Sequence, residues 1–457
     1  MVPNGLMHGH SFTRGTTLMT ALLLAFLHSS CVAVYRGTPA SRGESSRMDV
    51  AKVMNLRIHG LDNESSPPIL RIAERGKPLS GIGNDALTID FEIQSEVPPN
   101  ISLLLVHCDR HWVPTNNIFL QDPIRLKTSE FTIERSPIGV THYDYTGSIT
   151  FPQAGGRIAV EFSGNYLARI VDYYDNSKVL AEGRFFVVEP KSKVTVDLFS
   201  DFYESEQTDV LQHGLKIRVE AEPNYDVFGG QINGIELYPS WQWFDPLIAD
   251  AETDMGKRGR GDPWIRWYSS FGGKSVAEYS NIPSGNEHRL LDLTDLIYYP
   301  TTGGIVTTPL SDLPRREFLE FDNNGVSITR LVPFSDADYV NFEFRLDLKG
   351  GIAKEDIFVV GSFNNWRPSP EWRMSHDPNS GFYTVRGLLR RALHEYQYVA
   401  GEWDEEAGVL RKPDATLIEG NLTATSLPYY AFIYYRETTS GGYDRIVGAG
   451  VDISGHR

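Results

Sequence analysis

Cysteine and basic residues are scarce in this chain. Cys31 and Cys108 are the two cysteines among 457 residues, so a disulfide framework cannot hold the fold and stability must come from hydrophobic cores. Lys and Arg total 43 against 59 Asp and Glu, and the resulting formal net charge of -16 repels phosphate backbones. The composition therefore argues against a nucleic-acid partner.

Long hydrophobic runs are also missing from the body of the chain, because none after residue 31 approaches the roughly 18 residues that a transmembrane helix needs. A shorter apolar run, Leu18–Leu27, follows Arg14 and is typical of a signal segment. Cys31 follows Ser29 and Ser30 and is a lipidation candidate, with ordinary signal cleavage as the alternative. We expect an exported protein with a signal or lipoprotein segment at residues 1–31 and a flexible tether at residues 32–54.

Motifs for nucleophilic catalysis are absent, including a Gly-x-Ser-x-Gly elbow and a His-Glu-x-x-His helix. Cys108 lies in an apolar strand pattern that favours an inert buried thiol. His107, Asp109 and His111 alternate on one face of that strand and are metal-ligand types, but such side chains commonly bind backbone groups near a turn. We predict no enzyme activity, no cofactor and no metal, and keep a metal-dependent enzyme as a rival hypothesis.

The strand pattern predicts an all-β fold. Leu87, Ile89, Phe91 and Ile93 alternate with polar residues, and residues 101–109 form a more continuous apolar run that indicates a strand covered on both faces. Similar runs recur with turn residues between them. We predict three consecutive immunoglobulin-like β-sandwich domains at residues 55–190, 191–300 and 339–457, with a linker of short strands at residues 301–338.

A basic and aromatic segment at residues 257–267 interrupts the acidic trend. Arg and Trp are enriched at the energetically important positions of protein interfaces. The alternative is a long hairpin whose aromatic side chains fold back onto the sheet. The candidate partner-binding residues are Lys257, Arg258, Arg260, Trp264, Arg266 and Trp267.

The last predicted sandwich carries GSFNNW (361–366), FYTVRGLL (382–389) and YQYVAGEW (396–403), and it resembles starch- and glycogen-binding modules. The resemblance implies that Trp366 and Trp403 would be the sugar platforms, because aromatic faces stack on sugar rings. A Lys that normally hydrogen-bonds the glucan is replaced by Val399. A polar sugar ligand is therefore missing, and we expect glycan binding only as an alternative function.

A larger resemblance runs from about residue 55 to the C-terminus. Its motifs are VHCDRHWVPT (106–115), SGNYLARIVDYYDN (163–176), GRFFVVEP (183–190), IPSGNEHRLLDL (282–293), ADYVNFEFRL (337–346), VVGSFNNW (359–366), EYQYV (395–399), IEGN (418–421) and YDRIVGAG (443–450). In this order they are similar to the plug proteins of the type IX secretion system of Bacteroidota.

That resemblance implies a non-enzymatic periplasmic protein associated with the outer membrane. Its partner would be the barrel translocon of the type IX system, whose periplasmic opening it would seal between transport events. Membrane association would come through this partner or through a lipid anchor at Cys31. An exported glycan-binding protein that uses the C-terminal sandwich remains the alternative.

Overall fold

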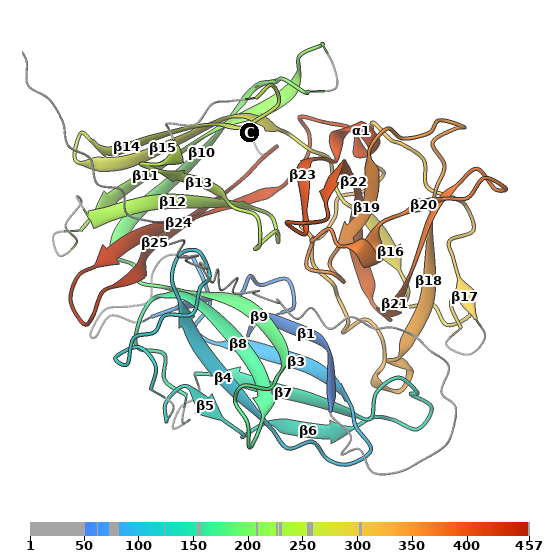
Figure 1. The fold of residues 1–457 in the computed structure, drawn as a ribbon, viewed down its shortest axis with the longest axis horizontal. Coiled ribbons are helices and arrows are strands. Elements are labelled where there is room, and N and C mark those ends of the chain that lie inside the picture. The colour runs from blue at the N-terminus through green and yellow to red at the C-terminus, as the bar shows by residue number, and fades with distance from the viewer. Residues whose placement is uncertain are drawn as a thin grey trace, which may run out of the picture. The chain divides into compact units, whose positions relative to one another are not determined.

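The structure is a computed structural model that describes residues 51–455 except residues 62, 73–81, 123, 153–155, 157, 207–208, 225–226, 228–230, 254–258 and 301–303. These residues form strands, short 3-10 turns such as η3 (Phe334–Asp336) and η4 (Pro370–Trp372), and the four-residue helix α1 (Thr416–Glu419). The all-β prediction is confirmed (Figure 1). Within the described residues, no helix is long and apolar enough to cross a membrane. The predicted signal segment and Cys31 lie outside the described residues.

The first pair of sheets contains the strands up to residue 188. One sheet has the order β1-β3-β7-β6 and the other β2-β9-β8-β4-β5. The alternating Leu87, Ile89, Phe91 and Ile93 all point into the core that the two sheets share. The strands are β1 (Lys52–Gly60), β2 (Ile69–Arg71), β3 (Leu87–Gln94), β4 (Ile101–Cys108), β5 (Lys127–Thr128), β6 (Thr132–Arg135), β7 (Tyr145–Phe151), β8 (Gly164–Asp172) and β9 (Val179–Val188).

The second pair of sheets has the orders β10-β11-β15-β14 and β13-β12-β24-β25. A separate hydrophobic core fills the space between them and includes Ile217, Ile235 and Ile433. The strands are β10 (Ser192–Tyr203), β11 (Gln212–Pro223), β12 (Ile232–Pro239), β13 (Leu247–Asp250), β14 (Trp264–Phe271), β15 (Lys274–Pro283), β24 (Pro428–Glu437) and β25 (Tyr443–Ile453).

The third pair of sheets is built from the chain between β15 and β24. Its sheets have the orders β17-β18-β21-β20 and β16-β22-β19, and β23 also pairs with β22. Their shared core includes Phe342, Phe344 and Tyr398. The strands are β16 (Arg289–Asp292), β17 (Ile305–Val306), β18 (Tyr339–Leu346), β19 (Asp356–Gly361), β20 (Ser375–His376), β21 (Tyr383–Arg390), β22 (Leu393–Asp404) and β23 (Val409–Asp414).

The predicted boundaries fail at three places. β1 begins at Lys52, inside the tether that we predicted at residues 32–54. β24 and β25, which we expected in the C-terminal sandwich at residues 339–457, pair with β12 of the second sheet pair, where Ile433 lies opposite Ile235. β16, which we expected in the second sandwich, pairs with β22 of the third. The third sheet pair is therefore inserted into the second. The prediction of three consecutive domains missed this insertion. Strand periodicity shows which face of a strand is apolar but not which strand lies beside it.

An aromatic cluster joins the first and second sheet pairs. Phe186 of β9 stacks on Phe432 of β24 with ring centroids 4.2 Å apart and an interplanar angle of 13°. Both side chains are fully buried, and Tyr238 and Trp243 pack around them. Because this apolar surface is removed from water at the junction, separating the two sheet pairs would expose it.

Phe432→Ala tests the placement of β24. We expect a loss of about 3–5 kcal/mol in the free energy of unfolding, because a buried phenyl ring is replaced by a cavity. Hydrogen exchange measured by mass spectrometry should accelerate in β8, β9 and β12. Phe271→Ala, at a ring that is 60% exposed, is the control and should change little. Acceleration confined to β18–β22 would contradict the observed pairing.

Candidate functional site

The three predicted metal ligands do not converge. His107 is buried, with its Nδ1 2.6 Å from Thr115 Oγ1 and its Nε2 3.3 Å from the Ser163 carbonyl oxygen. The Asp109 carboxylate accepts backbone N–H groups of His111 and Val113, both at 2.9 Å. The side chain of His111 is exposed. These side chains stabilise the turn after β4, which is the structural alternative that the sequence left open.

Burial also makes the neighbouring groups poor catalysts. It lowers the pKa of His107 to about 4, so the imidazole is neutral at physiological pH. It raises the pKa of the Cys108 thiol to about 12, which suppresses the nucleophilic thiolate. The strand therefore offers neither a general acid nor an activated nucleophile near neutral pH.

The basic and aromatic segment divides between two faces of β14. Trp267 and Ile265 pack against the core of the second sheet pair. Trp264 is 40% exposed, and the Arg266 guanidinium lies over its ring, 4.3 Å from the centroid. Arg260 forms an ion pair with Asp209 at 2.8 Å, while Lys257 and Arg258 lie outside the described residues. An exposed Trp–Arg pair remains on the outer face of an edge strand.

Trp366 is not an exposed sugar platform. It is 8% exposed, its Nε1 donates a 2.8 Å hydrogen bond to the Gly325 carbonyl oxygen, and it packs with Trp241 of the second sheet pair. Trp403 packs against Phe358 with ring centroids 5.3 Å apart and an interplanar angle of 38°, and it is only partly exposed. The GSFNNW turn thus packs against another part of the same chain, because its Trp is covered.

The turn itself explains the Gly and Asn residues of the motif. A Cβ on Gly361 would come within 2.4 Å of the Glu395 carbonyl oxygen, so only Gly allows β19 to approach β22 so closely. Asn364 accepts a 2.8 Å hydrogen bond from the Gly361 backbone N–H. Asn365 and Trp366 both have left-handed backbone angles, with φ of 54° and 59°. The tight turn places the Trp366 ring against His288.

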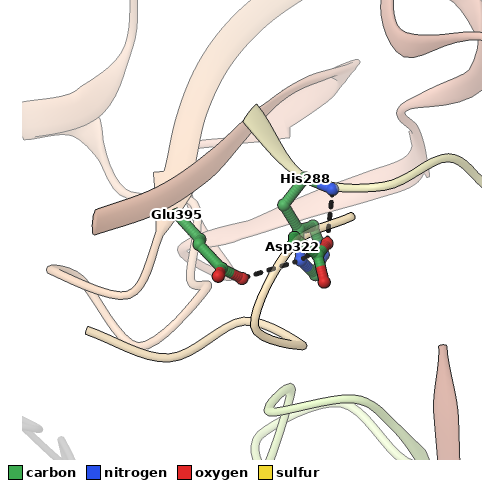
Figure 2. Close-up of side chains that lie close together, drawn as sticks. All are labelled: His288, Asp322 and Glu395. Atoms are coloured by element: carbon green, nitrogen blue, oxygen red, sulfur yellow. Dashed lines mark hydrogen bonds and ion pairs between the residues drawn. The ribbon is translucent and has the colours of Figure 1, made fainter. Parts of the chain in front are cut away.

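His288, Asp322 and Glu395 form a buried charged cluster beside this Trp. His288 immediately precedes β16, Asp322 lies in the FDNNG turn, and Glu395 lies on β22; Figure 2 shows the three side chains together. His288 Nδ1 is 2.7 Å from Asp322 Oδ2 and 3.5 Å from Glu395 Oε2. The His288 and Trp366 rings lie 4.2 Å apart. The cluster therefore fastens β16, β22 and the turn at residues 322–325 together.

Two carboxylates around one imidazole determine its charge. Burial favours the neutral ring, but the charges of Asp322 and Glu395 outweigh it and raise the pKa of His288 to about 10. Burial likewise opposes ionisation of Asp322, yet the pKa of its carboxyl is lowered because His288 is positive. The cluster is an imidazolium held between carboxylates at neutral pH.

The same donors are of the types that bind divalent cations, and their ligand atoms lie within 4.8 Å of one another. All four carboxylate oxygens, however, already accept backbone hydrogen bonds. Asp322 accepts them from His288 and Asn324, and Glu395 accepts them from Asn323 and Gly325. Since a cation would have to displace these contacts and deprotonate His288, the arrangement fits a structural ion cluster better than a metal centre.

Sequence reasoning missed this cluster. Asp322 lies within the linker of short strands predicted at residues 301–338, and Glu395 lies within the EYQYV motif, where neither was predicted as a site residue. The available signal was the acidic residue between His394 and Tyr396 in an otherwise apolar strand, since such a residue needs a partner when buried.

Two clefts adjoin the cluster. The larger, about 410 Å³, lies between the second and third sheet pairs and is lined by His288, Leu247 and Leu410 among others. The smaller, about 260 Å³, is lined by residues of all three sheet pairs, including Arg57, Arg184 and Ser327. Phe244, Asn365 and Trp366 line both clefts. The GSFNNW turn thus ends at a junction of the three sheet pairs.

His288→Gln tests the cluster. The pKa of folded His288 is raised above its ordinary value of 6.5, so its stabilisation is complete below about pH 6.5 and is lost as the pH rises through about 10. We expect the variant to lose about 3–5 kcal/mol in the free energy of unfolding at pH 6, because two buried carboxylates lose their cation. Urea unfolding should show this difference shrinking by pH 10, and a constant difference would contradict it. His111→Gln is the exposed control.

Comparisons with known proteins agree with the all-β fold. The family model described as "Type 9 secretion system plug protein 1st domain" matches residues 56–189. A crystal structure of a hypothetical protein from Parabacteroides merdae ATCC 43184 is similar with a TM-score of 0.64 and 17% identity, covering 88% of this chain and 97% of that chain. At that identity the likeness shows the fold alone.

No curated protein matches this chain. The matched residues 56–189 coincide with the first sheet pair and contain the motifs VHCDRHWVPT and SGNYLARIVDYYDN, which carried the resemblance in this region. Residues 56–189 are therefore similar to the first domain of the type 9 secretion system plug proteins.

Proposed function

We propose that this chain is a non-enzymatic periplasmic plug, which binds the periplasmic opening of the outer-membrane type 9 translocon and seals it between transport events. The observation that carries the proposal is the match of residues 56–189 to the plug-protein domain. The buried aromatic cluster around Phe186 and Phe432 supports it, because it makes that domain continuous with the rest of the chain. A plug must cover a wide pore, which requires domains that are packed together as one unit.

The titratable groups support a role without catalysis. In the described residues, the cluster of His288, Asp322 and Glu395 is the one group of three metal-ligand side chains close enough to hold an ion, and backbone groups occupy its carboxylates. His107 and Cys108 are buried with pKa values shifted away from neutral pH. These environments stabilise the fold and leave no exposed acid–base pair at those positions.

Each sheet pair is, in this proposal, an immunoglobulin-like sandwich. When strands are lettered along the chain, β1-β3-β7-β6 and β9-β8-β4-β5 have the order A-B-E-D and G-F-C-C′. The second sheet pair follows the same scheme, with β10-β11-β15-β14 and β25-β24-β12-β13. The third sandwich would then be an insertion between strands E and F of the second. Because two chain segments instead of one would then connect the second and third sandwiches, their relative motion would be restricted.

The outer face of β14 is the proposed contact with the translocon. Trp264, Arg266 and Tyr268 alternate along the strand and so share the face opposite Ile265 and Trp267. Trp264 and Tyr268 are 40% and 38% exposed. Stacked Trp–Arg pairs suit an interface that must be specific yet displaceable, because a few anchors can dominate a broad polar contact. A lipid anchor at Cys31 would be a second attachment.

The main residue of the glycan-binding alternative is not accessible to a sugar. Trp366 is covered by Trp241, and of the two expected platforms only Trp366 lines either cleft. Trp403 and Val399 remain in the third sheet pair without the polar ligand that sugar binding requires. We therefore propose no second function from this face.

Trp264→Ala tests both the partner and its contact face. The wild-type protein should co-purify with the barrel translocon from detergent-solubilised outer membrane, and its deletion should make the membrane leakier. The variant should bind about 30-fold or more weakly, the effect of losing a hot-spot residue worth at least about 2 kcal/mol.

Trp403→Ala is the matched control and should retain wild-type binding to the translocon. Absence of the translocon from wild-type preparations, together with an unchanged permeability on deletion, would contradict the plug function. Normal binding of the Trp264 variant would contradict only the contact face. Glucan retention that disappears in the Trp403 variant would favour the glycan alternative.

A further inference from the structure

Two arginines from different sheet pairs converge on one aromatic ring. Arg184 lies on β9, Arg367 follows the GSFNNW turn, and Phe244 lies in the loop between β12 and β13. The Arg184 and Arg367 guanidinium carbons lie 4.1 Å and 4.7 Å from the centre of the Phe244 ring. The Trp112 ring also contacts Arg184, at 4.3 Å. Aromatic faces thus orient both cations without neutralising them.

No carboxylate pairs with these two guanidinium groups within the part of the chain that the structure describes. The Arg184 Nη1 group donates a 3.2 Å hydrogen bond to the Trp243 carbonyl oxygen, which is uncharged. Acids that line the smaller cleft are already paired, Glu64 with Arg57 and Glu182 with Arg169. Asp245 lines the larger cleft, and the pKa of its carboxyl is raised by burial and not lowered by either arginine. Unpaired arginines are unexpected in a chain with 59 acidic residues.

The half-buried Arg184 carries an unpaired charge that costs stability in the folded protein. Burial is the main cause that lowers the pKa of Arg184 to about 10, and Arg367 adds to it by repulsion. The Arg367 side chain is exposed and places its charge at the larger cleft. An unpaired charge that lowers the stability of the fold is typical of a binding site, where the ligand supplies the missing negative charge.

The position of the pair gives a ligand access from both sides. Arg367 lines the 410 Å³ cleft and Arg184 the 260 Å³ cleft, and Phe244 lines both. Leu247, Pro368 and Leu410 contribute apolar surface to the larger cleft. A ligand with an apolar body in the larger cleft and an anionic group at Phe244 would pair with Arg367 and cover that surface, and a second anionic group in the smaller cleft would pair with Arg184.

We propose that Arg184 and Arg367 form a binding site for the carboxylates of an acidic, partly apolar peptide segment of a partner protein. Guanidinium groups bind carboxylates through paired hydrogen bonds, and the two groups approach the same ring from different sheet pairs. The larger cleft has room for a few side chains beyond the carboxylate, which a single small anion would leave unfilled. This site does not depend on the translocon being the partner.

The test uses the full chain and a blocked hexapeptide of alternating leucine and glutamate, with its glutamine counterpart. We expect the glutamate peptide to bind in a fluorescence anisotropy titration and the glutamine peptide not to bind. Arg367→Gln should weaken binding about tenfold or more, because a charge-assisted hydrogen bond is lost. Without peptide, the same variant should keep the wild-type thermal unfolding midpoint, because the Arg367 side chain is exposed and forms no ion pair within the described residues.

Arg373→Gln is the matched control, since Arg373 is paired with Asp356 at 2.6 Å and Glu405 at 3.2 Å. It should leave peptide binding unchanged and should not raise the unfolding midpoint. Equal binding of both peptides, or full binding by Arg367→Gln, would overturn the site. Inorganic phosphate that binds as tightly as the glutamate peptide would overturn the assignment to a peptide. A lower unfolding midpoint in Arg367→Gln would show a purely structural stacking role.

Discussion

Buried and partly buried carboxylates at the junctions between sheet pairs are held by arginines or hydrogen-bond donors of the neighbouring pair. Glu92 of β3 is 3% exposed and accepts a 2.6 Å hydrogen bond from Arg390 of β21. Glu189, after β9, pairs with Arg445 of β25 at 2.6 Å. Asp338 accepts hydrogen bonds from Thr141 and His142, at 3.0 Å and 2.8 Å. Separating the sheet pairs would leave these charges unpaired or return them to water, and it would break the surrounding hydrogen bonds.

This dependence changes how the third sheet pair is understood. Its GSFNNW turn resembles a sugar-binding frame, but Trp366 is inserted between His288 and Trp241. The aromatic ring that a binding module would present to a ligand here covers a buried imidazolium. Ligand access is shifted to the clefts beside the turn, where Arg184 and Arg367 remain without carboxylate partners in the described residues.

The sequence predicted much of the strand pattern and little of the strand pairing. Alternation at Leu87–Ile93 identified a core-facing strand, and the apolar run at residues 101–108 is indeed buried along most of its length. The partners of β16 and β24 were assigned wrongly because adjacent position in the chain was taken for adjacent position in the sheet. Long-range pairing depends on complementary surfaces that a single sequence does not reveal.

For the candidate sites too, the sequence predicted local features but not long-range contacts. The local environment of Cys108 followed from its apolar neighbours, whereas His288, Asp322 and Glu395 are separated by up to about a hundred residues and meet only in the folded chain. Trp264 and Trp267 were predicted as one group, but the strand's alternation places them on opposite faces. The spacing of these residues therefore shows which face each one occupies only when the strand itself is known.

The central claim is that the three sheet pairs act as one body. Spin labels at Ser177→Cys and Ser380→Cys, exposed positions on the first and third sheet pairs, would report on it in a chain that also carries Cys31→Ser, because the buried Cys108 should resist labelling. Double electron–electron resonance should give a single narrow distance distribution at low and high salt. A broad or two-peaked distribution would mean that the junction charges do not hold the sheet pairs together, and it would contradict the account.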